Sequence, residues 1–332
     1  MDLQETILDN ILKRFPKKSA AVKELADLLD TGQNAVYRRI RGESILTPRE
    51  IALLARHYNI SLDAIVQEQS ENVLFVYPAI VDSIQDFEKY LNSILDDLKE
   101  LQHLPNISIK YAASECPIFY YCFFPELISF KLYTWGKTAL GFNYLADIPF
   151  RFNLISPDVH AATRDLLQQY MELPSTELWN LNILDNTLNQ IEYYYESGSI
   201  DRLEDALVLC DRMNDLVDHL KQMAAKGKKF PVGAKQLEGR KDWQLFHNEM
   251  VDTNNTIIVS SDKGKAIYNT YGNPHFLKVM DQRVAEYIDQ WFNRILAKSQ
   301  LINTYEKARN QYFKKLLQKV ERTKKRLEMT KE

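Results

Sequence analysis

The sequence predicts a mainly α-helical protein in two folded parts: an all-α N-terminal domain and a larger, mostly helical α+β domain with a small antiparallel sheet. The chain has 332 residues, enough for two or three domains. Apolar residues recur at helical spacing through residues 1–66, and a polar segment follows at 67–72. Segments typical of strands occur only later, at 107–113 and 242–271. We therefore expect domains at 1–66 and 73–332, joined by a linker at 67–72.

Four short helices are expected in the N-terminal domain, near residues 3–12, 19–29, 33–41 and 48–58. Pro16 stops the first helix, and Ser19 can cap the second. Gly42 ends the third, because glycine adopts the left-handed conformation that follows many helices. The sequence TPRE at 47–50 places a capping Thr, a first-turn Pro and a Glu in the order of a capping box, which predicts the start of the fourth helix.

The C-terminal domain mixes helical and strand patterns. The expected helices are residues 82–103, 157–172, 176–197, 200–226, 276–298 and 303–328, and the expected strands are 107–113, 242–250, 255–261 and 265–271. The aromatic segment 117–140 is either a buried helix or a buried strand followed by a helix. Asp262-Lys263-Gly264 is a hairpin turn between the last two strands, which predicts the small antiparallel sheet.

Composition excludes several classes of protein. Three cysteines, none in CxxC spacing, argue for a reducing compartment and against a disulfide framework or a zinc site. No apolar run approaches the roughly 20 residues of a membrane span, and the acidic first residues lack the pattern of a secretory signal. We therefore expect a cytoplasmic protein with no membrane contact.

The net charge of −3 hides an uneven distribution. Residues 1–66 carry 10 basic and 9 acidic side chains, residues 67–293 carry 20 and 32, and residues 294–332 carry 12 and 4. The acidic middle of the chain is a poor candidate for wrapping a polyanion. The basic C-terminal helix could meet DNA, although a solvated face that pairs with acidic residues of the body is the simpler interpretation.

The second and third N-terminal helices have the sequence features of a helix-turn-helix. Ala26 provides a small residue where the two helices cross, and Asp30-Thr31-Gly32 provides a short turn. Val36 and Ile40, four residues apart, can dock the third helix on the core.

The opposite face of the third helix is polar. Its candidate DNA-binding residues are Gln33, Asn34, Tyr37, Arg38 and Arg41. Gln and Asn can pair bidentately with adenine and Arg with guanine, and the helix N-terminus favours a phosphate. A helical hairpin with a solvated basic face, which docks a protein instead, is the alternative interpretation.

The segment resembles the Cro/repressor-type (XRE-like) helix-turn-helix family over about residues 17–66. The resembling residues are Leu25-Ala26, the turn, Gln33-Asn34-Ala35-Val36, Arg41-Gly42-Glu43 and the segment TPREIALLARHYNISLD at 47–63. The resemblance extends to a bacterial regulator subgroup in which a large second domain follows the head. It implies DNA binding by a recognition helix in the major groove, as a dimer on a two-fold operator.

Three positions depart from the family pattern. Asp30 stands where the turn often has glycine, and Asp tolerates left-handed geometry better than most residues. Arg39 stands at a frequent core aromatic position. Val22 replaces a Gln that holds the DNA backbone in many members, so phosphate contacts have to come from elsewhere; the candidates are Lys17, Lys18, Lys23 and Ser44.

The rest of the chain offers no established catalytic pattern. None of the six histidines forms an HxxxH or HExxH motif, and Walker, GxGxxG and GxSxG motifs are absent from the sequence. We expect no catalytic residues, no metal and no cofactor. Ser260–Lys263 could line a ligand site, although ordinary turn residues are the simpler interpretation. Phe119–Phe124 could wall a ligand pocket, and core packing is the simpler interpretation here too.

These observations predict a sequence-specific DNA-binding transcriptional regulator whose C-terminal domain dimerises and senses an unknown signal. The expected partners are double-stranded DNA, a second copy of the chain, and a small-molecule or protein effector. The alternative is an enzyme or a protein-interaction adaptor that the helix-turn-helix head targets.

Overall fold

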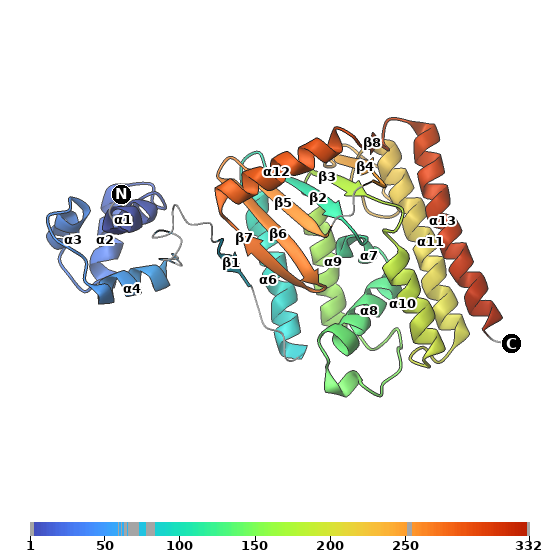
Figure 1. The fold of residues 1–332 in the computed structure, drawn as a ribbon. Coiled ribbons are helices and arrows are strands. Elements are labelled where there is room, and N and C mark those ends of the chain that lie inside the picture. Colours follow the sequence, from blue (N-terminus) through green and yellow to red (C-terminus); the bar gives the residue numbers. More distant parts are fainter. Residues whose placement is uncertain are drawn as a thin grey trace. The chain divides into compact units, whose positions relative to one another are not determined.

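The computed structural model describes residues 3–58, 60, 62, 65, 73–77, 84–250 and 254–330 (Figure 1). The chain divides into two compact units, Met1–Leu74 and Phe75–Glu332, which we call the head and the body. The predicted linker at 67–72 lies outside the described residues.

The described part of the head is all helical. Its elements are α1 (Leu3–Leu12), α2 (Lys18–Leu28), α3 (Gln33–Ile40) and α4 (Pro48–His57). Apolar side chains from all four helices, among them Ile11, Leu25, Val36 and Leu54, pack into one small core. Burial of this shared apolar surface, rather than the propensity of such short segments, holds the four helices together.

Helix starts in the head follow the predicted chemistry in one case and depart from it in another. Thr47 caps α4 and forms the expected capping box with Glu50. The prediction that Ser19 caps α2 is wrong. The helix starts at Lys18 with the extended residue Lys17 before it, so Ser19 already lies in the first turn.

Eight strands within the described part of the body form one sheet. They are β1 (Phe75–Val76), β2 (Ser108–Ala113), β3 (Ser175–Trp179), β4 (Trp243–His247), β5 (Thr256–Ser261), β6 (Gly264–Gly272), β7 (His275–Val279) and β8 (Gln300–Leu301). Their order is β1-β7-β6-β5-β2-β3-β4-β8. The neighbours β2, β3 and β4 are parallel, and the other pairs are antiparallel.

The body is α+β as predicted, but the small antiparallel sheet is a wrong expectation, because the sheet is mixed and has eight strands in the described residues. The β5–β6 hairpin forms at Asp262-Lys263, as its turn residues predict. Two other strands lie inside segments predicted as helices: β3 begins the predicted helix 176–197, and β7 begins the predicted helix 276–298. A parallel strand such as β3 has no hairpin turn beside it to mark it in the sequence.

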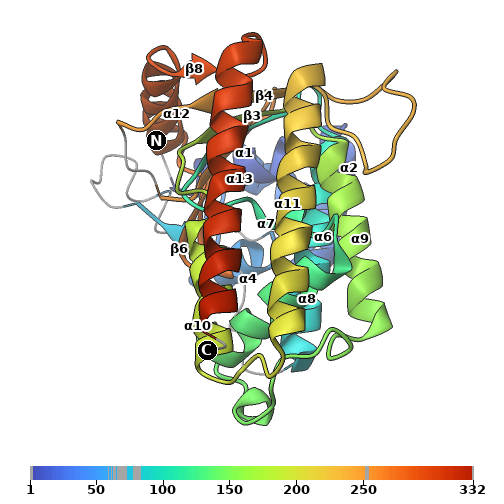
Figure 2. The same ribbon diagram turned by 90° about the vertical axis from the view of Figure 1, so that its right-hand side faces the viewer.

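Most helices of the body cover one face of the sheet (Figures 1 and 2). They are α6 (Ile84–Gln102), α7 (Ile118–Tyr121), α8 (Pro125–Thr134), α9 (Pro157–Met171), α10 (Asp185–Glu196), α11 (Leu203–Lys226) and α13 (Glu306–Met329). The segment 117–140 therefore forms helices rather than a strand, and it continues into a π-helical turn at Trp135–Ala139 and a 3-10 turn at Asn143–Leu145.

The other face of the sheet is covered by α12 (Gln282–Leu296) (Figure 1). Lys110 of β2 and Lys265 of β6 both donate to Asp289 of this helix, at 2.5 and 2.6 Å. Because Asp289 is almost fully buried, these two hydrogen-bonded ion pairs compensate the cost of removing its carboxylate from water.

The long helices α11 and α13 lie side by side at the edge of the body (Figure 2). The apolar stripe of α13 packs inward through Tyr312, Phe313, Leu316, Val320 and Leu327. Three of its basic side chains pair with acids of the body: Lys319 with Asp185, Lys324 with Asp211, and Arg326 with Glu192. The basic C-terminal face is thus partly paired internally.

A buried polar cluster lies where the helices meet β3. The Glu177 carboxylate is fully buried and accepts hydrogen bonds from the side chains of Tyr120, Tyr170, Ser175 and Trp179, at 2.6, 2.8, 2.9 and 3.1 Å. Four donors of this kind satisfy both oxygens of the buried charge.

Candidate nucleic-acid interface

The turn between α2 and α3 has the geometry that a helix-turn-helix requires. Asp30 adopts a φ of 48°, which lies in the left-handed region. The turn requires this conformation at the position where family members often have glycine. The Thr31 N–H donates to the Ala26 carbonyl at 3.0 Å, which closes the end of α2. Ala26 itself is buried, so its small side chain lets α3 approach.

One face of α3 docks on the head core. Val36 is only 1% exposed, and Ile40 packs against the same core. Arg39, at the frequent aromatic position of the family, is mostly buried and donates to Glu50 of α4 at 2.5 Å. Glu50 therefore does two things: it completes the capping box of α4 and it neutralises the Arg39 guanidinium.

Gln4 of α1 fixes the end of α3 and the loop that follows. Its amide nitrogen donates to the carbonyls of Arg39 and Ser44, at 2.8 and 2.9 Å. Its amide oxygen accepts from the Leu46 N–H at 2.6 Å. Sequence reasoning missed this role, because α1 and the loop are about 40 residues apart and no local pattern relates them. Glu50 was visible as a capping residue but not as the partner of Arg39.

The other face of α3 is open to solvent. Gln33, Asn34, Arg38 and Arg41 are all exposed. Asn34, Arg38 and Arg41 follow the i, i+4, i+7 spacing of a single helical face. Tyr37 differs from these four, because it is half-buried and packs partly against the head core. The structure thus brings four of the five predicted residues fully to the surface and the fifth partly so.

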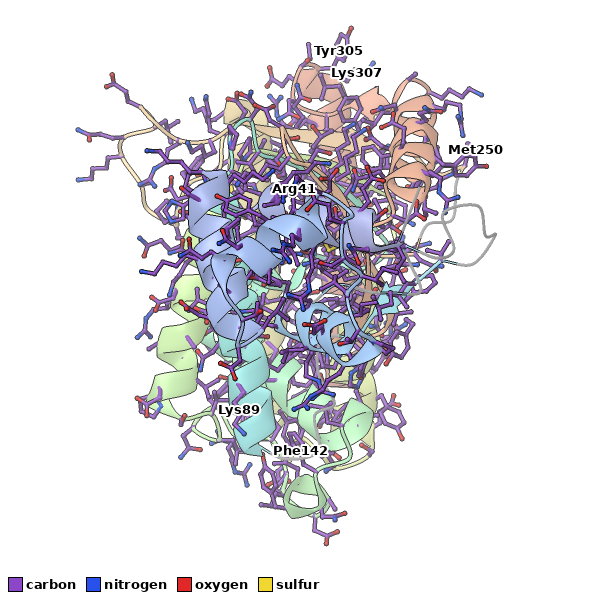
Figure 3. All side chains as sticks on the ribbon, turned by 90° about the vertical axis from the view of Figure 1, so that its left-hand side faces the viewer. Arg41, Lys89, Phe142, Met250, Tyr305 and Lys307 are labelled. Atoms are coloured by element: carbon purple, nitrogen blue, oxygen red, sulfur yellow. The ribbon has the colours of Figure 1, made fainter. Side chains whose placement is uncertain are left out.

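Arg41 lies just beyond the last residue of α3, where it caps the helix (Figure 3). It donates to Glu43 through Nε at 2.5 Å and through Nη2 at 2.9 Å. These hydrogen bonds lower the pKa of Glu43 and raise the pKa of Arg41, so both groups stay charged at neutral pH. Arg41 must therefore break its hydrogen bonds to Glu43 before it can bind another anion in the same way.

The first turn of α3 is free of a side-chain cap. Its N-cap is Gly32, in extended conformation and with no side chain to bond the first N–H groups. These groups and the helix dipole favour an anion such as phosphate. Of the candidate phosphate contacts, Lys17, Lys18 and Lys23 are exposed and Ser44 is half-buried.

The described residues contain neither a candidate membrane span nor a candidate metal centre. None of their helices is both long and apolar enough to cross a bilayer. No group of three or more His, Cys, Asp or Glu side chains in this part of the chain is arranged to hold a metal ion.

Comparison with known proteins identifies the head. Residues 21–65 match the model of the helix-turn-helix family. No curated protein and no solved structure matches the chain. The matched range contains α2, the Asp30 turn, α3 and α4. The N-terminal region of this chain is therefore a helix-turn-helix of the XRE type, and this match supports DNA as its partner.

Proposed function

We propose that the chain is a bacterial, cytoplasmic transcriptional regulator that binds DNA as a homodimer and reads sequence through α3. Gln33, Asn34, Tyr37, Arg38 and Arg41 make the contacts, and the body dimerises and senses a signal. In this proposal the chain is not an enzyme.

One observation carries the proposal. The buried Val36 anchors α3 from one side, while four exposed residues with bidentate hydrogen-bonding capacity, Gln33, Asn34, Arg38 and Arg41, line its other side. Arg pairs with the O6 and N7 of guanine, and Gln or Asn pairs with the N6 and N7 of adenine. The uncapped N-terminus of α3 is open to a backbone phosphate.

The dimer follows from the size of the recognition surface. One eight-residue helix touches only a few base pairs, too few for tight and specific binding. Two copies on a two-fold site double the contacts and set the half-site spacing at about one helical turn, roughly 34 Å, or a multiple of it.

The proposed mechanism is steric. A dimer occupies the promoter, and a signal that binds the body changes the separation of the two heads. A change in that separation misplaces one recognition helix, because half-site spacing is a geometric constraint.

The experiment is a selection of bound sequences from a random pool of duplex DNA, with the full chain. Wild type is compared with Gln33→Ala/Arg38→Ala and with Lys13→Ala, which removes an exposed positive charge near the end of α1. We expect wild type and Lys13→Ala to enrich one two-fold motif and the double variant to lose it.

Equal, weak and salt-sensitive binding by all three proteins would overturn the proposal. The head would then be a targeting or protein-docking module, and the enzyme and adaptor alternatives would be the ones to test.

A further inference from the structure

The body contains an apolar cavity of about 160 Å³ between α6, α9 and the sheet. Its walls include Leu91, Ile94 and Leu98 of α6, Ile109 of β2, and Ile257 and Val259 of β5. A cavity of roughly 150 Å³ with such a lining is large enough for one benzene-sized ring. Within the aromatic run at 119–124, Tyr120 and Tyr121 are fully buried in the core, while Phe119 lines this cavity.

Two buried polar groups in the cavity wall have unused hydrogen-bonding capacity. Tyr111 is 6% exposed, and its hydroxyl bonds to none of the residues that the structure describes. Asn255 is 7% exposed; its Oδ1 accepts from the N–H groups of Ser114 and Glu115, at 3.0 and 3.4 Å, but its amide nitrogen donates to no described residue. Neither the Tyr111 hydroxyl nor the Asn255 amide nitrogen is among the fully enclosed, unpartnered side-chain atoms of the described residues, so both are accessible and can donate to the oxygen of a small molecule in the cavity.

The charges in the wall disfavour an anionic ligand. The Lys131 ammonium is fully buried and committed, since it donates to Glu115, to Gln190 at 3.0 Å and to Thr187 at 3.3 Å. Burial would raise the pKa of Glu115, but the ammonium and two amide donors hold it below its ordinary value, so the pair is ionic. Asp97 adds a further carboxyl group to the wall. Among the described residues that line the cavity, no other positive charge is available for a ligand carboxylate or phosphate.

We propose that this cavity is the effector site of the regulator and binds a small, uncharged, mainly apolar molecule about the size of one substituted ring. One hydroxyl or carbonyl oxygen of the ligand accepts from the Tyr111 hydroxyl. The effector role, although not the binding itself, rests on the proposed function of the chain.

The position of the cavity in the chain suits this role. Its wall includes α6 and, through Phe276, strand β7. β7 pairs with β1, through which the chain first enters the body after the head. A ligand that tightens α6 and β7 therefore acts on the first elements that follow the head in sequence.

The test uses the full chain without DNA and three probes of similar shape: benzyl alcohol, toluene and benzoate. Dissociation constants come from saturation-transfer NMR and calorimetry, up to 10 mM probe. We expect benzyl alcohol and toluene to bind and benzoate to bind at least ten-fold more weakly. Tyr111→Phe should weaken benzyl alcohol about five-fold, the value of one hydrogen bond, and leave toluene unchanged. Ile94→Trp should fill the cavity and abolish binding of all three.

Tyr287→Phe, which removes an exposed hydroxyl from α12, is the matched control and should bind all probes as wild type does. Near-ultraviolet circular dichroism checks that Ile94→Trp is folded. If it is not folded, the affinities of wild type and Tyr111→Phe for benzyl alcohol and toluene test the proposal without it. Absence of benzyl alcohol binding, or equal affinity for benzoate, would overturn the proposal. The DNA selection is run without probe, so the two experiments are independent. Failure of the DNA selection does not change the result on probe binding, and failure of probe binding does not change the result of the DNA selection.

Discussion

Arg41 and Glu43 form a two-point ion pair on the exposed surface at the end of α3, with Nε–Oε1 at 2.5 Å and Nη2–Oε2 at 2.9 Å. Arg41 is one of the five predicted DNA-binding residues, so the Glu43 carboxylate competes with DNA for its guanidinium. The pair also places the Glu43 carboxylate on the exposed surface directly beside Arg41.

Glu43→Gln should therefore strengthen DNA binding. The substitution frees Arg41 and removes a charge that repels phosphate, so we expect affinity to rise several-fold at low salt. The slope of log K against log salt should steepen, because removal of the Glu43 carboxylate raises the net positive charge that the head presents to DNA. Fluorescence anisotropy at four salt concentrations measures both quantities.

Asp9→Asn removes an exposed acid of α1 and is the matched control, with a much smaller expected gain. Weaker binding by Glu43→Gln would contradict this account and would mean that Glu43 orients Arg41 for its contact.

Glu50→Ala should destabilise the head more than removal of its helix cap alone. The substitution deletes the capping box and leaves the Arg39 guanidinium, 15% exposed, without its carboxylate. We expect a loss of about 2–3 kcal/mol, against about 1 kcal/mol for Thr47→Ala, which removes the cap but keeps the Arg39 pair. Hydrogen-exchange mass spectrometry on peptides from 33–58 reports the difference, since local opening free energies set amide protection. Equal loss in the two variants would mean that the Arg39–Glu50 pair contributes nothing.

Lys229 should make the stability of the body depend on pH. The side chain is fully buried, lies 3.5 Å from the centre of the Tyr170 ring, and donates to the Tyr170 carbonyl at 3.2 Å. Burial lowers its pKa to about 7, partly opposed by the nearby Glu177 carboxylate, from about 10.4 in an unfolded chain. Between these values the unfolded state binds more protons, so the free energy of unfolding rises with pH.

The expected gain between pH 7 and 8.5 is about 1–2 kcal/mol relative to Lys229→Met, in which this contribution is absent. Urea unfolding monitored by the fluorescence of the buried Trp179 and Trp243 gives the difference. Taking the difference between the two proteins cancels the groups that they share. If the unfolding free energies of wild type and Lys229→Met changed in parallel with pH, burial would not lower the pKa of Lys229 and the prediction would be wrong.

Local sequence signals predicted the head well. Thr47, Pro48 and Glu50 act within one turn of helix, so their pattern alone places the start of α4. Gly42 and Asp30 take left-handed conformations at the ends of α3 and α2, where the sequence predicts breaks. The contacts of Gln4 were not predictable in this way, because they join α1 to a loop about 40 residues later.

The body was less predictable because its decisive contacts are non-local. β3 pairs with β2 and β4 across long helical crossovers, so no neighbouring turn marks it, and its residues merge with the pattern of the next helix. Tyr111 reads as an ordinary strand residue in the sequence. Only the fold shows that Tyr111 lines a cavity.

The central claim is that α3 reads DNA sequence, and the affinity of Arg38→Ala tests it most directly. Binding of wild type and Arg38→Ala is measured at one fixed salt concentration, to the selected motif and to a scrambled duplex of equal length. We expect Arg38→Ala to lose about 1–3 kcal/mol of binding free energy on the motif and much less on the scrambled duplex. Equal affinity of the two proteins for the motif, or an equal loss on both duplexes, would contradict it.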